Sequence, residues 1–409
     1  MRVENRYSFN DISDCVHCGK CKASCPTYIE NPTEIMGARG RVALLRKFNE
    51  GEITATKRLY DSVFSCILCE ACNKSCPLGI RISDAVYIGR KSLRNYDKKR
   101  LLVNHLIKLA FKNPFITFKL LKILKIISSL PRAENLYLIG HLKRLGITIP
   151  DSQFRGKTSV FRARNPRGRL AIFSGCVVNG IYPYYGRSLV NILNSLRYDV
   201  IIPPGEVCCG APLLELGSEK DAARMAEINI EAFKNLNVEA VISLCPTCVH
   251  FIKNIYKRQI GDCIDNALDI SQFLTGRFSG MPELSKDRLT ENPAASFINP
   301  GSNCIYHDPC HSKFGLNIYE EPRNILKMLG LNLIEPDESG CCGFGGTFRL
   351  FYEDLSEGIL QNRLESYKKA DMIITSCPNC ILQLKSRLKD RNVIHIIDII
   401  AGVIKKNDV

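Results

Sequence analysis

The chain lacks several features of exported, membrane-spanning and nucleotide-binding proteins. Its first residues, MRVENRYSFND, are polar and charged, so we expect no secretory signal peptide. No apolar stretch reaches the roughly twenty nearly uncharged residues that a membrane-spanning helix needs, because lysines interrupt the most apolar one. Dinucleotide and flavin fingerprints are absent, and the glycine-rich segment 343–346 lacks the Lys-Ser/Thr ending of a phosphate loop. The sequence therefore favours a cytoplasmic protein that does not itself hold a flavin.

Cysteine, in contrast, is plentiful and regularly spaced. The 409 residues include 20 cysteines, and all but two of them fall into two short runs followed by two longer motifs. A reducing cytoplasm keeps thiols free, so we expect bound metal rather than a disulfide framework. The two outside the pattern are Cys263 and Cys304, which we expect to be small buried residues.

Each short run has the spacing Cys-x2-Cys-x2-Cys-x3-Cys-Pro. The runs comprise Cys15, Cys18, Cys21 and Cys25, then Cys66, Cys69, Cys72 and Cys76. Bacterial ferredoxins share this spacing, and in them the fourth cysteine of one run binds the cluster of the other run. We therefore expect two [4Fe–4S] cubanes. The first would be held by Cys15, Cys18, Cys21 and Cys76, and the second by Cys66, Cys69, Cys72 and Cys25. Zinc is the alternative, although its sites typically use separated Cys-x2-Cys pairs.

Paired cubanes without a substrate pocket of their own transfer electrons, and we expect this role for an α-helical ferredoxin-type domain at residues 1–95. A helix-like stretch from Glu34 to Phe48 lies between the two runs. The intervening segment resembles the helical adaptor of respiratory iron–sulfur subunits. Its Arg39 and Arg41 are expected on a solvated or interface surface.

Positive charge is concentrated in one segment. The formal net charge is +15, and residues 97–169 contribute seventeen Lys or Arg against three acids. A nucleic-acid protein with bound zinc would explain this charge but not the ferredoxin-type runs, so we expect no nucleic-acid partner. The spacing of Lys108, Lys112, Lys119, Lys122 and Lys125 suits one face of a helix, with apolar residues opposite and a break at Pro114. We expect residues 96–168 to form a basic helical connector that covers the protein's own domains, a partner or a membrane surface.

From about residue 170 the chain repeats itself with an offset of 132 to 134 residues. In each copy three apolar runs alternate with helix-like stretches, and the cysteines follow the apolar runs. Strands that alternate with helices indicate an α/β fold with parallel-type sheets, in which functional groups gather beyond the carboxyl ends of the strands. We expect two such domains, at residues 169–290 and 300–409. Ser218 and Asp221 suggest a capping box at the start of one long helix.

Each repeat carries five cysteines in the order Cys, Cys-Cys-Gly, Cys-Pro-x-Cys. They are Cys176, Cys208, Cys209, Cys245 and Cys248 in the first copy, and Cys310, Cys341, Cys342, Cys377 and Cys380 in the second. Adjacent cysteines suit a turn that sends two thiolates toward one polynuclear site, and the glycines after them, Gly210 and Gly343, permit unusual backbone conformations. Five thiolates exceed the needs of one zinc ion or one cubane. Zinc with a spare cysteine is the alternative.

These motifs resemble the cysteine-rich CCG domain of heterodisulfide reductases and of the iron–sulfur subunits of glycolate oxidase, lactate utilisation and anaerobic glycerol-3-phosphate dehydrogenase. The resemblance covers essentially the whole chain. The order of modules is most similar to that of the membrane-associated heterodisulfide reductases, which fuse cubane and CCG modules in one polypeptide. It implies that each complete set of five cysteines holds a noncubane [4Fe–4S] cluster, and that the pair divides a substrate disulfide between them. The ten cysteines of the repeats would then be the catalytic residues.

Two functions follow from the resemblance. The first is a disulfide-reducing iron–sulfur oxidoreductase, which receives electrons through the cubanes from a membrane cytochrome b-type or flavoprotein partner. The second is a non-catalytic electron-transfer component of a flavin-dependent glycolate, lactate or glycerol-3-phosphate dehydrogenase. Completeness of both cysteine sets favours the first. Residues 97–169 would allow peripheral association with the cytoplasmic face of a membrane.

Histidines near the motifs are candidates for proton transfer. His307 and His311 flank Cys310, and either could protonate a departing thiolate near neutral pH. The alternative is a hydrogen bond to a cluster sulfur or to the backbone. His250, after Cys248, is expected to be a helix residue.

Overall fold

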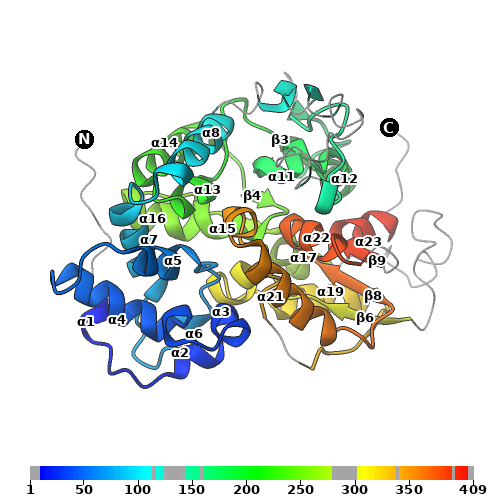
Figure 1. Ribbon diagram of the computed structural model, residues 1–409. Helices are drawn as coiled ribbons and strands as arrows, with labels where there is room; N and C mark the ends of the chain where they lie inside the picture. The colour runs from blue at the N-terminus through cyan, green and yellow to red at the C-terminus, as the bar shows by residue number, and fades with distance from the viewer. Residues whose placement is uncertain are drawn as a thin grey trace.

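Helices are the only regular structure among the described residues up to Leu93. The computed structural model describes residues 10–112, 117–120, 122–123, 125, 140, 143–155, 160–278, 302–337, 340–388 and 392–403. Its N-terminal elements are α1 (Asn10–Ser13), α2 (Lys20–Ala23), α3 (Pro26–Glu30), the 3-10 helix η1 (Glu34–Met36), α4 (Ala38–Asn49), α5 (Lys57–Phe64), α6 (Ala71–Ser75) and α7 (Ile82–Leu93). This helical part lies at the lower left of Figure 1.

Helix α7 is the central helix of this part. Most of its residues are buried, and it packs against α4, α5 and α6. Arg90 in α7 is only 3% exposed, and its guanidinium donates hydrogen bonds to the carbonyls of Val63, Phe64 and Cys66. A buried guanidinium needs several acceptors, and here the end of α5 and the first cysteine of the second run supply them. Arg90 therefore fixes the position of that run.

The basic connector begins with α8 (Lys98–Lys112), in which Asp97 Oδ1 accepts from the amide of Arg100 at the N-terminus. Lys108 forms an ion pair with Asp221 of the first repeat at 2.6 Å, and Lys125 forms one with Asp151 at 3.2 Å. Part of the basic face therefore covers the protein's own domains. Pro114, with the break expected there, lies outside the described residues. No helix within the described part of the chain is long and apolar enough to cross a bilayer.

The first repeat forms a five-stranded sheet in the order β1-β3-β2-β4-β5. Only β1 is antiparallel among these strands. The strands are β1 (Val160–Phe161), β2 (Gly168–Ile172), β3 (Tyr198–Ile201), β4 (Ala240–Ser243) and β5 (Ala267–Asp269). Its helices are α11 (Gly175–Gly180), α12 (Pro183–Ser195), α13 (Ala211–Glu215), α14 (Glu219–Lys234), α15 (Pro246–His250), the π-helix η3 (Phe251–Ile255), α16 (Tyr256–Ile260) and α17 (Ile270–Phe278).

The second repeat has a four-stranded, wholly parallel sheet in the matching order β7-β6-β8-β9. Its elements are β6 (Asn303–Tyr306), the π-helix η5 (His311–Gly315), α19 (Glu320–Met328), β7 (Asn332–Leu333), α20 (Thr347–Phe351), α21 (Glu353–Glu365), β8 (Met372–Thr375), α22 (Pro378–Lys385), β9 (Asn392–His395) and α23 (Ile396–Val403). All six strands expected from the apolar runs are present. Both repeats add a further strand, β5 and β9. The expected domain boundaries stay predictions.

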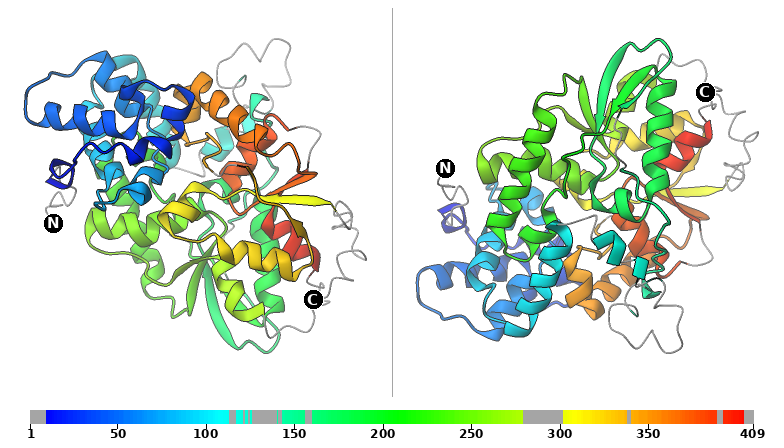
Figure 2. Two further views of the ribbon diagram at one scale, coloured as in Figure 1. Left: turned by 90° about the horizontal axis from the view of Figure 1, so that it is seen from below. Right: turned by 90° about the horizontal axis from the view of Figure 1, so that it is seen from above.

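The two repeats pack in a reciprocal way. Helix α12 of the first contacts α23 of the second, and α17 contacts α19, so equivalent helices exchange partners across the junction (Figure 2). One apolar core, including Leu170, Tyr185, Tyr306 and Ile396, spans both sheets, and another joins the helical part to the first repeat. Continuous cores hold the three parts in a fixed arrangement.

One detail of the predicted helices is wrong. Ser218 makes no side-chain hydrogen bond at the start of α14, so the expected capping box is absent. Asp221 pairs instead with Lys108 of the connector. A tertiary ion pair has replaced the local cap.

Candidate metal centres

The five cysteines of the first repeat converge beyond the carboxyl ends of its strands. Cys176 lies in α11 after β2, Cys208 and Cys209 precede α13, and Cys245 and Cys248 lie at the start of α15 after β4. Neighbouring thiols are in hydrogen-bonding contact in the order Cys176, Cys208, Cys209, Cys248, Cys245. The five side chains form one connected group.

The second repeat reproduces this arrangement. Its thiols are in contact in the equivalent order Cys310, Cys341, Cys342, Cys380, Cys377, and the Cys342 and Cys380 sulfurs lie 3.3 Å apart. The glycines after the cysteine pairs, Gly210 and Gly343, both have φ of +85°, a conformation that favours glycine. A Cβ at Gly343 would also lie 2.7 Å from the Ser356 carbonyl oxygen. These glycines form the tight turn that directs adjacent cysteines to one centre.

Both groups of cysteines border a single cavity. Cys245 of the first repeat is in hydrogen-bonding contact with Cys377 of the second, so the two groups are continuous. Nine of the ten cysteines line a cavity of about 320 Å³; Cys208 lies behind Cys176 and Cys209. The sequence predicted each group, but not that the two groups meet directly.

Close packing drives the pKa values of these buried thiols apart. Hydrogen bonds from Cys208 and Cys248 lower the pKa of Cys209 to about 6, and hydrogen bonds from Cys248 and Cys377 lower that of Cys245. Donating to Cys209 and Cys245, together with burial, raises the pKa of Cys248. Several buried thiolates in one place need compensating cations, because isolated charges are costly to bury. The donor set therefore fits polynuclear centres with sulfur ligands.

The ferredoxin-type runs are brought together as their spacing predicts. Cys25 lines a cavity of about 20 Å³ together with Cys66, Cys69 and Cys72. In the first run, burial above all, and also the nearby thiol of Cys15, raise the pKa of Cys21 to about 11. Cys76 ends α6, which packs against α2 of the first run. The fourth cysteines thus lie near the opposite runs, while the assignment of ligands stays a prediction.

Arg41 differs from expectation, because it is buried rather than solvated. Its side chain is 1% exposed and donates to the Ser62 carbonyl at 2.7 Å, to Ser65 Oγ at 3.2 Å and to Cys25 Sγ at 3.7 Å. It places a positive charge beside the four-cysteine cavity. Arg39, in contrast, is partly exposed and pairs with Glu34.

The helical part and the second repeat meet at cysteines. Cys69 packs in one apolar cluster with Cys341, against which Cys310 also lies. His311 contributes a second connection, since its Nε2–H donates to the Leu68 carbonyl at 3.0 Å and its Nδ1 is 2.9 Å from Thr247 Oγ1. Both ring nitrogens are therefore bonded, which favours the backbone-bonding role of His311 over protonation of a thiolate.

His250 and Glu70 form a buried pair that the sequence did not reveal. His250 lies in α15, as expected, and its ring stacks on that of His311 with centroids 5.2 Å apart. Its Nε2 lies 3.2 Å from Glu70 Oε1, and Arg258 also approaches this carboxylate. Glu70 follows Cys69 in the helical part, its partner His250 belongs to the first repeat, and His250 stacks on His311 of the second repeat. The pair therefore lies where the helical part and the two repeats meet. No motif could have revealed this pair, since 180 residues separate its members.

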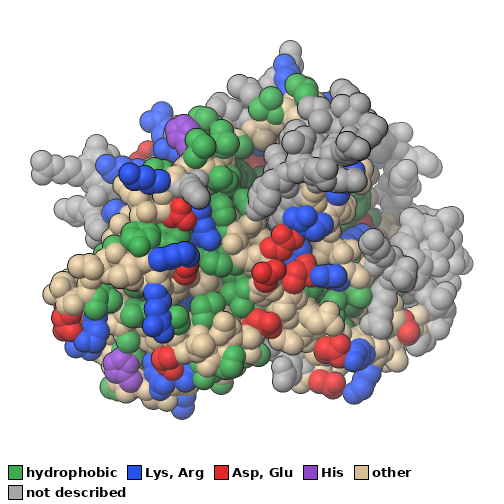
Figure 3. Space-filling model, viewed as in Figure 1, with side chains coloured by type: hydrophobic (Ala, Val, Ile, Leu, Met, Phe, Trp, Pro, Cys, Tyr) green, Lys and Arg blue, Asp and Glu red, His purple; other side chains and the backbone are tan. Residues whose placement is uncertain are grey.

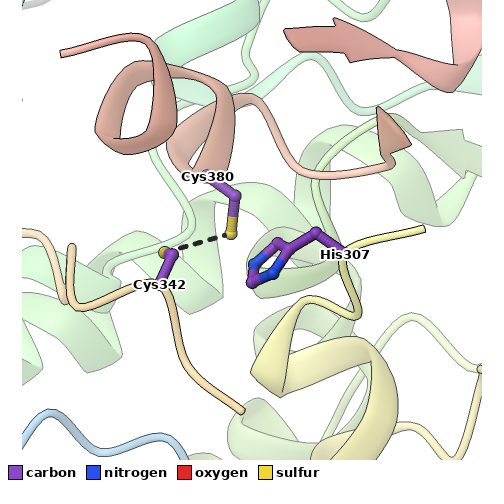
Figure 4. A group of neighbouring side chains, drawn as sticks. All are labelled: His307, Cys342 and Cys380. Carbon is purple, nitrogen blue, oxygen red and sulfur yellow. Dashed lines mark hydrogen bonds between the residues drawn. The ribbon is translucent and has the colours of Figure 1, made fainter. Parts of the chain in front are cut away.

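His307 is directed toward the second cysteine group. Its Nδ1 lies 2.6 Å from the Tyr367 hydroxyl, and the ring points toward Cys342 and Cys380 (Figure 4). Burial lowers the pKa of His307 to about 3, so the ring is neutral. At the position equivalent to His307 the first repeat has Phe173, whose ring packs against that of Phe233 with centroids 5.6 Å apart. The second group therefore has a polar neighbour that the first lacks.

The two remaining cysteines behave differently. Cys304 is 1% exposed within β6, as expected. The prediction for Cys263 is wrong, because its partly exposed thiol donates to Asp265 at 3.0 Å.

Comparisons with known proteins agree with this organisation. Residues 170–253 and 304–385 match the cysteine-rich domain CCG, and residues 11–80 match a 4Fe-4S dicluster domain. A probable glycolate oxidase iron-sulfur subunit of Bacillus subtilis is 27% identical over 93% of this chain and 90% of its own length. The glycolate oxidase iron-sulfur subunit of Escherichia coli is 25% identical, over 96% of this chain and 94% of its own.

A further relative is one of the subunits of a fumarate reductase (CoM/CoB) from Methanothermobacter marburgensis. It is 26% identical over 98% of this chain and 74% of its own length. These relatives align with nearly the whole of this chain but carry different substrates in their names. The chain is therefore an iron–sulfur oxidoreductase subunit in which a 4Fe-4S dicluster domain precedes two CCG cysteine-rich domains, and it holds multiple [4Fe–4S] clusters.

Proposed function

We propose that the protein reduces a low-molecular-weight disulfide at the cavity between its two CCG domains. The observation that carries this proposal is the shared cavity of about 320 Å³, which nine of the ten repeat cysteines line. Because this space is continuous, the centres held by the two cysteine groups lie next to each other. Two facing groups suit a substrate with two sulfur atoms.

In this proposal the ten repeat cysteines hold a pair of noncubane [4Fe–4S] clusters, five for each. When bound, the pair supplies electrons one at a time to the two sulfurs of the substrate. Contact between Cys245 and Cys377 keeps the two groups adjacent, so that both sulfurs of one small molecule can be reached. The apolar lining, which includes Ile107, Phe111 and Leu350, excludes water from the reacting sulfurs.

Electrons would enter through the dicluster domain. We propose one cubane on Cys15, Cys18, Cys21 and Cys76, and the other on Cys66, Cys69, Cys72 and Cys25. Packing of Cys69 with Cys341, and against Cys310, supports an exit from the second cubane toward the second CCG domain. Arg41 beside Cys25 would stabilise added negative charge there.

The second candidate is an electron-transfer component of a flavin-dependent 2-hydroxy-acid dehydrogenase. The names of the Bacillus subtilis and Escherichia coli relatives favour it. In this alternative the same cofactors carry electrons from a flavoprotein, and the shared cavity brings the two CCG clusters close enough for transfer.

Either function requires a redox partner, and we propose that α8 contributes to its docking surface. Leu102, Leu106 and Leu109 follow one face of α8 and are 66%, 58% and 46% exposed. Figure 3 shows hydrophobic side chains gathered over this helix. Lys108 is turned inward to Asp221, so the exposed face is more apolar than its sequence predicts. A membrane cytochrome or a flavoprotein with an apolar patch would fit.

Metal analysis after anaerobic purification tests the cofactor part of the proposal. Four [4Fe–4S] clusters amount to roughly sixteen irons per chain. About eight irons would remove the noncubane clusters and favour the relay, and zinc without iron would overturn both. Turnover with a reduced dye and small disulfides, including coenzyme M–coenzyme B heterodisulfide, separates the enzyme from the relay. Intact clusters without turnover, together with co-purification of a flavoprotein, would favour the relay.

A further inference from the structure

Glu215 borders two separate cavities. On one side lies the cysteine-lined cavity of about 320 Å³. On the other lies a cavity of about 10 Å³, whose lining includes Tyr60, Arg100, Asn104 and Tyr352. Glu215 thus connects the helical part of the chain with the space between the CCG domains.

The carboxylate of Glu215 is held in a fixed position. Its Oε2 accepts hydrogen bonds from the amide and the hydroxyl of Thr347, at 3.2 and 3.1 Å, across the junction of the two CCG domains. A Cβ at Gly346 would lie 2.7 Å from the same oxygen, so this close approach requires glycine. Arg90 donates to the backbone carbonyl of Glu215 at 2.9 Å. Thr347 and the close approach of Gly346 therefore hold the carboxylate, while Arg90 holds the backbone of Glu215.

The smaller cavity is lined by both polar and apolar side chains and has about the size that one water molecule occupies. Among the described residues, Asn104 Oδ1 is buried without a hydrogen-bond partner. Arg100 donates to the Tyr352 hydroxyl at 2.9 Å, and the Arg100 side chain is 21% exposed. The cavity therefore lies between Glu215 and a polar group that reaches the surface.

Reduction of a disulfide requires protons in the larger cavity. The balanced reaction is R–S–S–R′ + 2 e⁻ + 2 H⁺ → RSH + R′SH, in which the S–S bond breaks and two S–H bonds form. Neither histidine near Cys310 is well placed as the source. Both nitrogens of His311 are bonded to Thr247 and Leu68. His307 is not among the residues that line the larger cavity, and burial lowers its pKa to about 3, so its ring carries no acidic proton near neutral pH. The cavity needs another proton donor.

We propose that Glu215 carries protons from the smaller cavity into the cysteine-lined cavity, an inference that rests on the proposed disulfide reduction. In each of two steps, the Glu215 carboxyl gives its proton to a product thiolate. A proton from solvent, passed on by water in the smaller cavity, then reprotonates the carboxylate. The electrons come singly from a reduced one-electron donor through the dicluster domain.

The electrostatic surroundings of Glu215 suit this role. Burial raises the pKa of Glu215 to about 7, against the opposing effects of the Thr347 donors and the Arg90 guanidinium. The other groups that face it are Arg100, Tyr60 and Tyr352 around the smaller cavity and the repeat thiols across the larger one. Near neutral pH the carboxyl can both release and recover a proton.

Redox titration of the fully loaded protein between pH 6 and 9 tests the inference without requiring turnover. Added negative charge on the CCG centres raises the proton affinity of Glu215, so reduction takes up a proton. From about pH 7 upward, the wild-type midpoint potential should fall with pH. The limiting slope is that of a tenfold change in proton concentration, about 59 mV per pH unit for a one-electron couple. Glu215→Gln should abolish this slope.

Two further variants keep the experiment decisive. Glu219→Gln makes the same chemical change four residues later, where the carboxylate pairs with Lys91, and should retain the wild-type slope. If the Glu215→Gln protein loses its iron, the Thr347→Val variant is titrated in its place. Without the hydroxyl donor, the pKa of Glu215 rises, and the pH at which the slope begins should move upward. An unchanged slope in Glu215→Gln, or an unchanged onset in Thr347→Val, would overturn the proton route.

Dye-linked turnover separates this inference from the proposed function. If the protein reduces no disulfide but Glu215→Gln abolishes the slope, the proton uptake by Glu215 stands and the disulfide reaction falls. If disulfides are reduced and Glu215→Gln keeps both the slope and the wild-type pH profile of kcat, the proton route falls alone.

Discussion

Cys245 of the first CCG domain is in hydrogen-bonding contact with Cys377 of the second, although 132 residues separate them. The contact makes the ten repeat cysteines one continuous group rather than two distant sets. It supports our proposal that the two CCG domains act together on one substrate.

Replacing Cys245 should remove iron from the first CCG domain. We expect Cys245→Ser to lower the iron content from roughly sixteen to roughly twelve atoms per chain, because one four-iron cluster loses a ligand. Dye-linked disulfide turnover should fall at least a hundredfold. The matched control is Cys263→Ser, whose thiol donates to Asp265 and stands outside the motifs. Equal iron loss in both variants would contradict the assignment.

The crossed ligands that we propose for the dicluster domain predict an effect at a distance in sequence. Cys25 shares a cavity with Cys66, Cys69 and Cys72, so Cys25→Ser should disturb the cluster of the second run. We expect the loss of one cubane signal in electron paramagnetic resonance of the reduced protein. The same signal should be lost in Cys69→Ser, while Cys76→Ser should remove the other one. If Cys25→Ser instead resembles Cys18→Ser, the runs are not crossed.

The His307–Tyr367 pair should show strong coupling in stability. Tyr367→Phe leaves His307 Nδ1 buried without its 2.6 Å partner, which costs about 1–3 kcal/mol. The double variant His307→Phe/Tyr367→Phe replaces the polar pair with two apolar rings, like the packed pair Phe173 and Phe233 of the first domain, and should recover most of that loss. Thermal unfolding of the wild type, the two single variants and the double variant, each with its clusters bound, gives the coupling energy of the pair as a double-mutant cycle. Additive losses would show that the hydrogen bond does not stabilise the fold.

Asp269 should make stability depend on pH. Burial raises its pKa from 3.8 to about 7. The folded state thus holds this proton more tightly than the unfolded state. The contribution to stability is full below about pH 4 and is lost as pH rises through about 7. Each unit of pKa difference corresponds to about 1.4 kcal/mol.

Asp269→Asn keeps an acceptor for the Ser271 amide, which donates to Asp269 Oδ1 at 2.8 Å. Its unfolding midpoint should exceed that of the wild type at pH 8 and approach it at pH 5. The control Asp354→Asn changes an exposed carboxylate and should show no such trend. A constant difference between pH 5 and pH 8 would contradict the burial of a titrating carboxyl.

The leucine face of α8 should matter for partner binding and not for the cofactors. Leu102→Gln/Leu106→Gln/Leu109→Gln should keep the wild-type iron content but lose co-purification of the redox partner from the native cell. Replacing Lys108, Lys112, Lys119, Lys122 and Lys125 with Gln tests charge separately. Unchanged recovery of the partner and of the membrane-bound fraction in both variants would exclude this surface.

Local patterns predicted the strands, the long helices and the convergence of each cysteine group. The reason is that spacing within one motif reports the geometry of one turn or one strand end. Gly210 and Gly343, for example, were expected in unusual conformations because only a tight turn directs two adjacent thiolates to one centre.

Contacts between motifs were not predictable in this way. Arginine is usually a surface residue, so the sequence predicted an exposed Arg41. Its guanidinium is buried instead, because the Ser62 carbonyl and the Cys25 sulfur accept its hydrogen bonds. Glu70 and Glu215 carry no motif, and their roles depend on His250 and Thr347, which lie 180 and 132 residues away. Such pairs exist only once the three domains have packed together.

The most direct test of the central claim is the stoichiometry of a reaction between the dye-reduced, fully loaded protein and a small disulfide. We predict two electrons consumed and two thiols formed per disulfide, with catalytic turnover that Cys245→Ser and Cys377→Ser each abolish. Fully loaded protein that exchanges electrons with the dye but forms no thiol from any disulfide supplied would contradict the account.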